Sequence, residues 1–171
     1  MFILILKALW FILPAYIANG TPPVLSKFKK LQKYNKPIDF GKTWKGKEIL
    51  GKGKTWFGLF FGVLVGTVFG LIQNLTEIEP LMTLELAFML AFGALVGDLI
   101  GSLIKRRMNL ARGKSAPILD QLDFIFGAFL FASFVTKINL NYLIILIILT
   151  PLLHIGTNIL AYELKLKKEP W

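Results

Sequence analysis

Three aspartates interrupt apolar stretches of this sequence, where a carboxylate needs a specific reason to be present. Asp98 lies in the stretch 83–104, and Asp120 and Asp123 lie three residues apart in the stretch 118–136. A charged side chain near the middle of a membrane helix costs about 2.5–3.5 kcal/mol on insertion scales, so it is a functional candidate by default. Oxygen ligands without histidine or cysteine favour Mg²⁺ or a similar cation, completed by water and substrate phosphates. The three aspartates therefore predict a metal site that binds a phosphate.

The spacing of these residues predicts that they share one site. Asp98, Ser102 and Lys105 are spaced i, i+4, i+7, which places them on one helix face. At a rise of 1.5 Å per residue, Asp98 lies about 10 Å from Lys105 along the helix axis. Asp120 and Asp123 share a face of the next helix, about 4 and 9 Å from its proline-marked start. All three carboxylates therefore reach a similar depth below one surface.

A group of cations follows Asp98 at the end of the same helix. Lys105, Arg106 and Arg107 are consecutive, and they could hold phosphates at the mouth of the site. An alternative interpretation pairs each aspartate with a lysine or arginine as a structural salt bridge. The metal site is favoured over that alternative because intramembrane carboxylates most often mark functional positions.

A short glycine-lysine motif occurs twice before the second apolar stretch. The segment Gly41–Gly46 recurs twelve residues later as Gly53–Gly58, and each copy contains Gly-Lys-Thr-Trp. Backbone N–H groups and an ammonium in such a loop suit phosphate binding, which makes Lys54 and Thr55 candidate contacts. Neither copy has the upstream glycine of a P-loop. A lysine-rich loop beside anionic lipids is the alternative interpretation.

Composition and hydropathy predict an all-α integral membrane protein with five transmembrane helices. The chain of 171 residues is 55% hydrophobic, and its mean hydropathy is +0.63, which is too apolar for an ordinary soluble domain. It has no cysteine and one histidine, which excludes disulfides, thiolate metal sites and any site that needs two histidines. Five stretches are long enough to span about 30 Å of hydrocarbon. They lie near residues 2–19, 56–75, 83–104, 118–136 and 140–162.

The distribution of positive charge predicts the orientation of these spans. The net charge is +10, and all lysines and arginines except Lys7 and Lys137 lie in 20–55, in 105–117 or in the C-terminal tail. Cations confined between apolar runs are typical of membrane proteins and argue against nucleic-acid binding. With five spans these segments share one side, so the N-terminus is outside and the C-terminus cytoplasmic. A cleaved signal peptide over residues 1–20 is the alternative, but it lacks a basic start and a clear cleavage site.

Two apolar stretches carry a glycine at every fourth position. The glycines are Gly58, Gly62, Gly66 and Gly70 in the first stretch, and Gly93, Gly97 and Gly101 in the second. Such ladders give a helix a flat face on which another backbone can approach closely, so they predict helix packing. Because Asp98 follows Gly97, tight packing would also hold this carboxylate near its partners.

Two segments together resemble a known family of membrane enzymes. The segments Gly97–Arg106 and Leu119–Asp123 are similar to those of the CTP:phosphatidate cytidylyltransferase superfamily, and the whole chain most resembles its archaeal branch, the CDP-archaeol synthase family. Segments 18–23, 53–58 and 115–117 add to the resemblance. The chain lacks a Pro-Gly-His-Gly-Gly stretch of the bacterial and eukaryotic enzymes and has Gln121 where they usually have arginine, which favours an archaeal ether lipid over a diacyl lipid.

The resemblance implies one membrane-embedded cytidylyltransferase domain over residues 1–171. Its substrates would be CTP and 2,3-bis-(O-geranylgeranyl)-sn-glycerol 1-phosphate, and its products CDP-archaeol and pyrophosphate. Asp98, Asp120 and Asp123 would hold Mg²⁺, with Lys105 as a fourth catalytic residue, and a second cation or a homodimer is compatible with the resemblance. The expected substrate-binding residues are Asn19, Lys54, Thr55, Ser102, Arg106, Arg107, Lys114 and Ser115. The enzyme would lie in the cell membrane with its active site facing the cytoplasm, where CTP and the lipid phosphate meet.

Several other functions fit the residues less well. A small cation transporter also uses intramembrane carboxylates, but it would not need glycine-lysine loops, and the sequence has no evident inverted repeat. A histidine-dependent lipid-phosphate phosphatase is disfavoured by the single histidine, His154. A CDP-alcohol phosphotransferase would need a longer aspartate-rich motif than the segment 120–123. Asn19 could contact a headgroup or simply cap the first helix.

Overall fold

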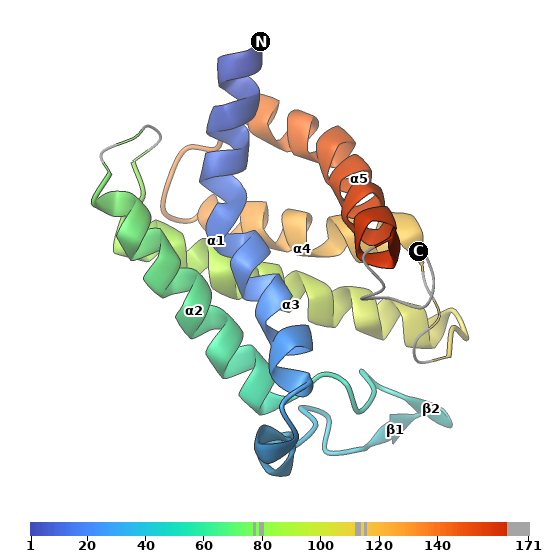
Figure 1. Ribbon diagram of the computed structural model, residues 1–171. Helices are drawn as coiled ribbons and strands as arrows, with labels where there is room; N and C mark the ends of the chain where they lie inside the picture. The colour runs from blue at the N-terminus through green and yellow to red at the C-terminus, as the bar shows by residue number, and fades with distance from the viewer. Residues whose placement is uncertain (77, 79–80, 112–113, 115, 164–171) are drawn as a thin grey trace.

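Five long helices form the body of the protein, and a small polar region covers one end of it in the computed structural model (Figure 1). The structure describes residues 1–171 except 77, 79–80, 112–113, 115 and 164–171. The helices are α1 (Phe2–Ser26), α2 (Trp56–Asn74), α3 (Leu84–Arg107), α4 (Pro117–Ala132) and α5 (Leu140–Glu163). The polar region between α1 and α2 contains a 3₁₀ helix, η1 (Lys29–Tyr34), and two short strands, β1 (Thr43–Trp44) and β2 (Lys47–Glu48).

Three helices of the described part of the chain, α1, α2 and α3, are both long and apolar enough to cross a membrane. The apolar part of α5, Leu140–Leu153, is shorter. The 16 residues of α4 extend about 24 Å at 1.5 Å per residue, which is less than the hydrocarbon thickness of about 30 Å. The chain is therefore a mostly helical membrane protein with three clear candidate spans.

The first helix is longer than its apolar stretch predicts. The predicted membrane span near residues 2–19 lies within α1, and the helix continues through Pro22 and Pro23 to Ser26. A proline removes one backbone hydrogen bond and leaves the carbonyl four residues earlier without its partner. Thr21 lies in the same turn, and its hydroxyl donates to Ile17 O at 2.7 Å. Asn19 therefore lies inside the helix, and its expected alternative role as a helix cap is wrong.

A buried glutamine compensates for a third proline in α1. Pro14 lies in the middle of the helix and cannot donate to the carbonyl of Trp10. Gln73 of α2 is buried, and its Nε2 donates to this same carbonyl at 2.8 Å. The bond satisfies an acceptor in an apolar interior and joins α1 to α2 near the end opposite the polar region.

The glycine ladders pack the helices as the sequence predicts. A Cβ atom at Gly62 would meet Leu95, one at Gly66 would meet Ala91, and one at Gly70 would overlap Ala87. These pairs step along α2 and α3 in opposite directions, so the two helices are antiparallel with their backbones close together. The glycines of α2 also face α1, and Gly93 and Gly97 of α3 face Gly127 of α4. The second ladder thus brings α3 directly against α4.

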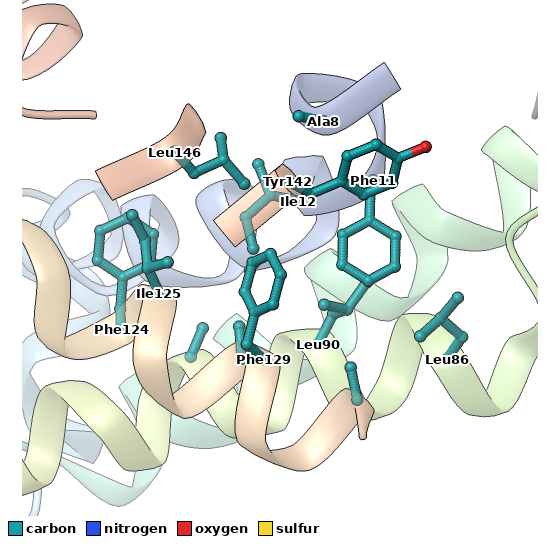
Figure 2. Packing of buried hydrophobic residues seen from close by; sticks show 14 of the residues in the cluster. Ala8, Phe11, Ile12, Leu86, Leu90, Phe124, Ile125, Phe129, Tyr142 and Leu146 are labelled. Atoms are coloured by element: carbon teal, nitrogen blue, oxygen red, sulfur yellow. The ribbon is translucent and has the colours of Figure 1, made fainter. Parts of the chain in front are cut away.

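One apolar cluster joins α1, α3, α4 and α5 (Figure 2). Its larger members are Phe11, Ile12, Met82, Leu86, Leu90, Phe124, Ile125, Phe129, Tyr142 and Leu146. The ring of Phe11 lies 5.5 Å from that of Phe129 and 5.7 Å from that of Tyr142, in tilted arrangements that aromatic pairs favour. This cluster packs residues 124–132 of α4 against α1, α3 and α5.

The polar region contains a β-hairpin, so the expected all-α class holds only for the helical body. Thr43 pairs with Glu48, and Trp44 pairs with Lys47 in antiparallel register. Both residues of the connecting turn have positive φ, 52° at Lys45 and 74° at Gly46. This pattern is that of a type I′ turn, which matches the twist of two antiparallel strands. The first glycine-lysine motif therefore forms a hairpin, whereas the second leads into α2.

Candidate active site

A polar pocket of about 280 Å³ lies where the C-terminal end of α1, the start of α2 and the middle of α3 meet. Four of the residues that the sequence analysis singles out line it: Asn19, Lys54, Thr55 and Asp98. The extension of α1 supplies Pro22 and Pro23 as one wall of this pocket. Asn19, one turn earlier on the same helix, lines the pocket together with Lys54 and Thr55 of the second glycine-lysine motif.

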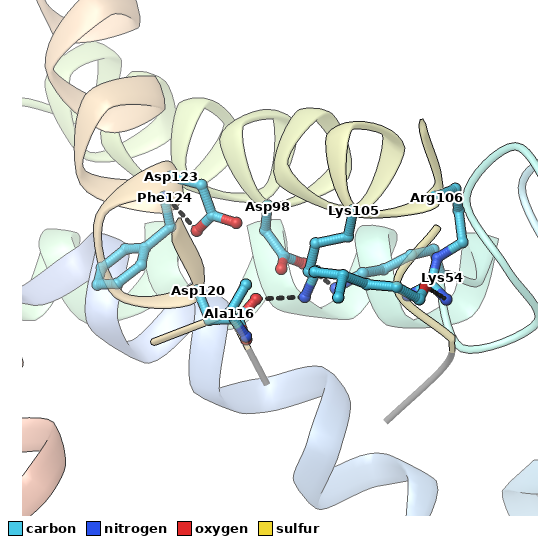
Figure 3. A network of polar contacts seen from close by, with 9 residues as sticks. Lys54, Asp98, Lys105, Arg106, Ala116, Asp120, Asp123 and Phe124 are labelled. Atoms are coloured by element: carbon cyan, nitrogen blue, oxygen red, sulfur yellow. Dashed lines mark hydrogen bonds and ion pairs between the residues drawn. The ribbon is translucent and has the colours of Figure 1, made fainter. Parts of the chain in front are cut away.

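Lys54 and Asp98 form an ion pair inside this pocket (Figure 3). Lys54 Nζ donates to Asp98 Oδ2 at 2.5 Å, and the two side chains are 27% and 22% exposed. The next residue, Thr55, is the N-cap of α2, and its Oγ1 accepts from the N–H of Gly58 at 3.1 Å. Threonine satisfies an otherwise unpaired donor at a helix start. The cap therefore fixes the backbone that presents Lys54 to Asp98.

A second ion pair joins the end of α3 to the start of α4. Lys105 donates to Asp120 Oδ1, and the Lys105 side chain is 14% exposed. The other oxygen of Asp120 accepts from the N–H of Ala116 at 2.9 Å. A carboxylate in the first turn is favourable beside the exposed N–H groups of a helix start. Asp120 therefore has both a local role in starting α4 and a position beside Lys105.

Asp123 lies against the glycine face of α3. A Cβ atom at Gly101 would overlap the carboxylate of Asp123, and one at Gly97 would overlap its backbone carbonyl. The side chain lies close enough to Asp98, Asp120 and Lys54 to interact with their charges. Figure 3 shows the three aspartates on the facing sides of α3 and α4, together with both lysines. The absence of side chains at the two glycines is what allows this approach.

The three carboxylates do not form a complete metal site by themselves. Among the residues that the structure describes, no group of three or more His, Cys, Asp or Glu side chains could hold a metal ion. Asp98 and Asp120 each point to a lysine instead. Each ammonium offsets the negative charge of the carboxylate that it contacts. Oxygens of this kind nevertheless suit Mg²⁺, which keeps water and takes one or two carboxylates with substrate phosphates.

Both arginines at the end of α3 are bonded to backbone carbonyls. Arg106 is buried, and its Nη1 donates to Leu110 O at 2.6 Å, which closes the helix end. Arg107 donates to Trp44 O at 2.8 Å, to Glu48 O at 2.6 Å and, more weakly, to Lys47 O at 3.4 Å. Its guanidinium also lies over the Trp44 ring, 5.1 Å from the centroid. The structure therefore places the two guanidinium groups in loop contacts and not in the pocket.

Two of the remaining predicted residues, Ser102 and Lys114, are not among the residues that line the pocket. Ser102 is 2% exposed and is buried among the helices. Lys114 is exposed in the link between α3 and α4. Ser115 lies outside the residues that the structure describes. Of the expected set, the structure thus brings the three aspartates, Lys54, Thr55, Lys105 and Asn19 to one end of the bundle.

Asp39 is a structural residue of the site that the sequence analysis misses. It is buried, and its carboxylate accepts from the N–H groups of Gly41, Leu50 and Gly51 at 2.9–3.0 Å. Burial alone would raise the pKa of this carboxyl group, but the three hydrogen bonds together lower it below its ordinary value. An aspartate two residues before a glycine is a recognisable turn signal. Asp39 thus folds the loop that ends at Lys54.

Comparison with known proteins identifies the family of this chain. A family model described as CarS-like, CDP-archaeol synthase, matches residues 1–171. The chain belongs to the CDP-archaeol synthase family. It is 48% identical to the CDP-archaeol synthase of Pyrococcus horikoshii, over 98% of this chain and 97% of that protein. It is 41% identical to the CDP-archaeol synthase of Methanocaldococcus jannaschii, over 98% of each chain.

A solved structure supports both the family and the fold. It is described as an intramembrane enzyme for archaeal membrane lipids biosynthesis, and it superposes with a TM-score of 0.80 at 36% sequence identity. The match covers 91% of this chain and 94% of the other. The chain therefore shares its overall fold with that intramembrane enzyme.

Proposed function

We propose that this protein transfers the cytidylyl group of CTP to 2,3-bis-(O-geranylgeranyl)-sn-glycerol 1-phosphate, which yields CDP-archaeol and pyrophosphate. Membership of the synthase family supports this activity. Three aspartates and two lysines meet at the polar end of an apolar helix bundle. This cluster is the observation that supports assigning the activity to these residues. Such a site can receive a nucleotide from water and a lipid phosphate from the membrane surface.

The reaction needs little covalent help from the protein. A phosphate monoester has a second pKa near 6, so the lipid phosphate is largely dianionic at neutral pH. One of its oxygens attacks the α-phosphorus of CTP, a new P–O bond forms, and the bond to the β-phosphate oxygen breaks to release pyrophosphate. The main obstacle is repulsion between two polyanions. Positively charged groups that neutralise and align them therefore provide most of the catalysis.

Lys54 and Lys105 are the cations best placed for this task. Lys54 contacts the carboxylate of Asp98, and Lys105 contacts that of Asp120. Both ammonium groups are therefore present in the site but only partly exposed to water. When triphosphate oxygens arrive, each ammonium can turn to a phosphate while remaining near its aspartate. A lysine is a flexible point charge and is suited to such a change of partner.

The three aspartates suit Mg²⁺ once Lys54 and Lys105 have turned toward the phosphates. Asp98, Asp120 and Asp123 offer only carboxylate oxygens, which is the donor chemistry that Mg²⁺ prefers. They would hold the ion together with phosphate oxygens and water, and a second cation is compatible with the same donors. The ion would supply positive charge to the phosphates.

We also infer that all five helices are membrane-associated, with the N-terminus outside and the pocket facing the cytoplasm. The polar region next to the pocket contains the lysine-rich segment 20–55, and positive segments favour the cytoplasmic side. A single cysteine at exposed Lys42 should be shielded from an impermeant thiol reagent in intact cells, and one at Leu75, beyond the far end of α2, should react. The reverse pattern would overturn this orientation.

The activity is tested with purified protein, CTP, Mg²⁺ and the unsaturated ether-lipid phosphate. We expect pyrophosphate and CDP-lipid in equal amounts, loss of both with EDTA, and a preference for the ether lipid over a diacyl phosphatidate. Reconstitution into liposomes provides the control for the transporter alternative. Ion flux without any nucleotide-lipid product, across all these substrates, would reject the proposal.

A further inference from the structure

A groove of about 520 Å³ lies in the turn between α1 and η1. Lys27, Phe28, Lys30 and Leu31 line it. Phe28 is 56% exposed, and both lysines are exposed. In the part of the chain that the structure describes, neither lysine has a carboxylate partner. The groove therefore combines two cations that no carboxylate neutralises with an apolar side chain that is open to its surroundings.

The position of this groove is that of a membrane surface. The candidate span α1 has 25 residues, which extend about 38 Å and can cross about 30 Å of hydrocarbon. It ends at Ser26, directly before the groove, and Val24 in its last turn is exposed. At the other end of η1, the half-exposed ring of Tyr34 stacks on Phe57 of α2 at 6.0 Å. Because tyrosine is enriched at the level of lipid headgroups, the turn and η1 are placed to meet them.

We propose that this groove binds an anionic phospholipid of the cytoplasmic leaflet, with its phosphate at Lys27 and Lys30 and its chains along Phe28 and Val24. Charge complementarity selects this occupant, because lysines next to a membrane helix attract anionic headgroups. A soluble phosphate would not need the exposed phenylalanine, and a neutral lipid would leave both lysines without a partner. The groove shares no lining residue with the polar pocket, so this lipid is not the substrate.

Backbone contacts connect η1 to the loop that carries Lys54. The segment 35–38 follows η1 and runs beside residues 54–56. The N–H of Ile38 donates to Lys54 O at 2.9 Å, and the N–H of Trp56 donates to Lys36 O at 3.0 Å. A lipid that holds the turn in place should therefore also oppose the opening of this pairing. The bound phospholipid would thus help to keep Lys54 in position.

Native mass spectrometry of the purified protein tests the site. The probes are an anionic diether phosphoglycerol lipid and a zwitterionic diether phosphocholine lipid with the same chains. We expect selective retention of one anionic lipid, weakened about tenfold or more in Lys27→Gln/Lys30→Gln, because each lysine near a headgroup contributes to binding. Lys42→Gln/Lys45→Gln removes two exposed lysines of the hairpin and is the matched control. Equal retention of the two lipids, or equal losses in the two double variants, would overturn the site.

The apolar half of the groove is tested without a change of charge. Phe28→Ser should weaken retention of the anionic lipid about tenfold, the lower end of the range for burial of a phenylalanine. Phe40→Ser, at another exposed phenylalanine, should not. Unaltered retention in Phe28→Ser, or displacement of the lipid by water-soluble glycerol phosphate, would indicate a site for soluble anions. Retention confined to the phosphomonoester substrate would assign the groove to the reaction, and either result overturns the inference.

Hydrogen exchange in bilayers tests the connection to Lys54. Anionic lipid should slow exchange of the Ile38 and Trp56 amides relative to a zwitterionic bilayer, and the slowing should increase with the anionic fraction, as for a ligand of the closed state. Lys27→Gln/Lys30→Gln should abolish the difference. Equal exchange of the wild-type protein in both bilayers would overturn the connection. No CTP is present in these experiments, so their results are independent of the proposed reaction.

Discussion

Lys54 donates to Asp98 across 44 positions of sequence, at 2.5 Å. The pair joins the loop before α2 to the middle of α3, and both side chains are mostly covered. Charges in such surroundings are screened less than surface charges, so each partner depends strongly on the other. The loop that carries Lys54 is in turn held by Asp39 and Arg107. The site therefore consists of a charged centre and a loop whose folding positions one half of that centre.

Loss of a carboxylate charge in α4 should abolish turnover but preserve the fold. We expect Asp120→Asn and Asp123→Asn to lower kcat by about 10²-fold or more, the scale of losing one preorganised electrostatic group. A neutral amide is easier to bury than a carboxylate, so thermal unfolding in detergent should change little. Glu85→Gln, at the other end of α3, is the matched control and should keep full activity. Wild-type rates in both aspartate variants would eliminate their role in metal binding.

The two lysines should be needed for binding and alignment of the phosphates. Lys54→Ala and Lys105→Ala remove charge that offsets repulsion between the substrates, so kcat/KM for CTP should fall by about 10- to 100-fold. Lys105→Arg need not restore it, since a planar fork does not always replace a point charge. Lys52→Ala removes an exposed lysine of the same loop and should have little effect. Equal losses in Lys52→Ala and Lys54→Ala would indicate a general charge effect in place of a specific contact.

Arg107 should act as a positioning residue for the hairpin. Its guanidinium donates to three carbonyls of residues 44–48, and each net hydrogen bond contributes about 0.5–1.5 kcal/mol. We expect Arg107→Lys to speed hydrogen exchange of the hairpin amides and to raise the KM for CTP, with a smaller change in kcat. A lysine keeps the charge but not the fork. Unchanged exchange combined with a lower CTP affinity would instead mean that Arg107 contacts phosphate directly.

The loop around Asp39 should become less stable in acid. Its carboxyl pKa is lower in the folded loop than in the unfolded chain, where it is about 3.9. The associated stability is therefore present above the unfolded pKa and is lost as the pH falls through the folded one. Protection of the Leu50 and Gly51 amides from hydrogen exchange, relative to unfolded peptide rates, should drop below about pH 4. Asp39→Asn should remove this pH dependence, and an unchanged profile in that variant would contradict the assignment.

The helical body was largely predictable because its signals are local and periodic. The glycine ladders and the apolar stretches repeat at helical spacing, and Gly97 and Gly101 do bring α4 against α3. The end of α1 was not predictable in the same way. Pro22 packs against Gly58 of α2, and such tertiary contacts can offset the two lost hydrogen bonds that make prolines look like a helix end.

The direction of each charged side chain was the least predictable part of the site. Lys105, Arg106 and Arg107 are consecutive in sequence, yet only Lys105 meets an aspartate, while the arginines bind carbonyls of loops. Which carbonyls are unpaired depends on how the hairpin and the α3 end fold, and residue type alone does not specify this. The two glycine-lysine motifs also show that residue type alone does not specify the local structure. Nearly identical residues form a hairpin in one copy and a helix cap in the other, because their neighbours differ.

The most direct test of the proposed chemistry follows the phosphorus atoms of CTP. Purified protein is incubated with Mg²⁺, the unsaturated ether-lipid phosphate and CTP that carries radioactive phosphorus at either the α or the γ position. Attack at the α-phosphorus predicts that α label enters the organic-phase lipid while γ label appears only in pyrophosphate, in equal amounts. Gamma label in the lipid, or α label that remains entirely in water-soluble products, would contradict the account.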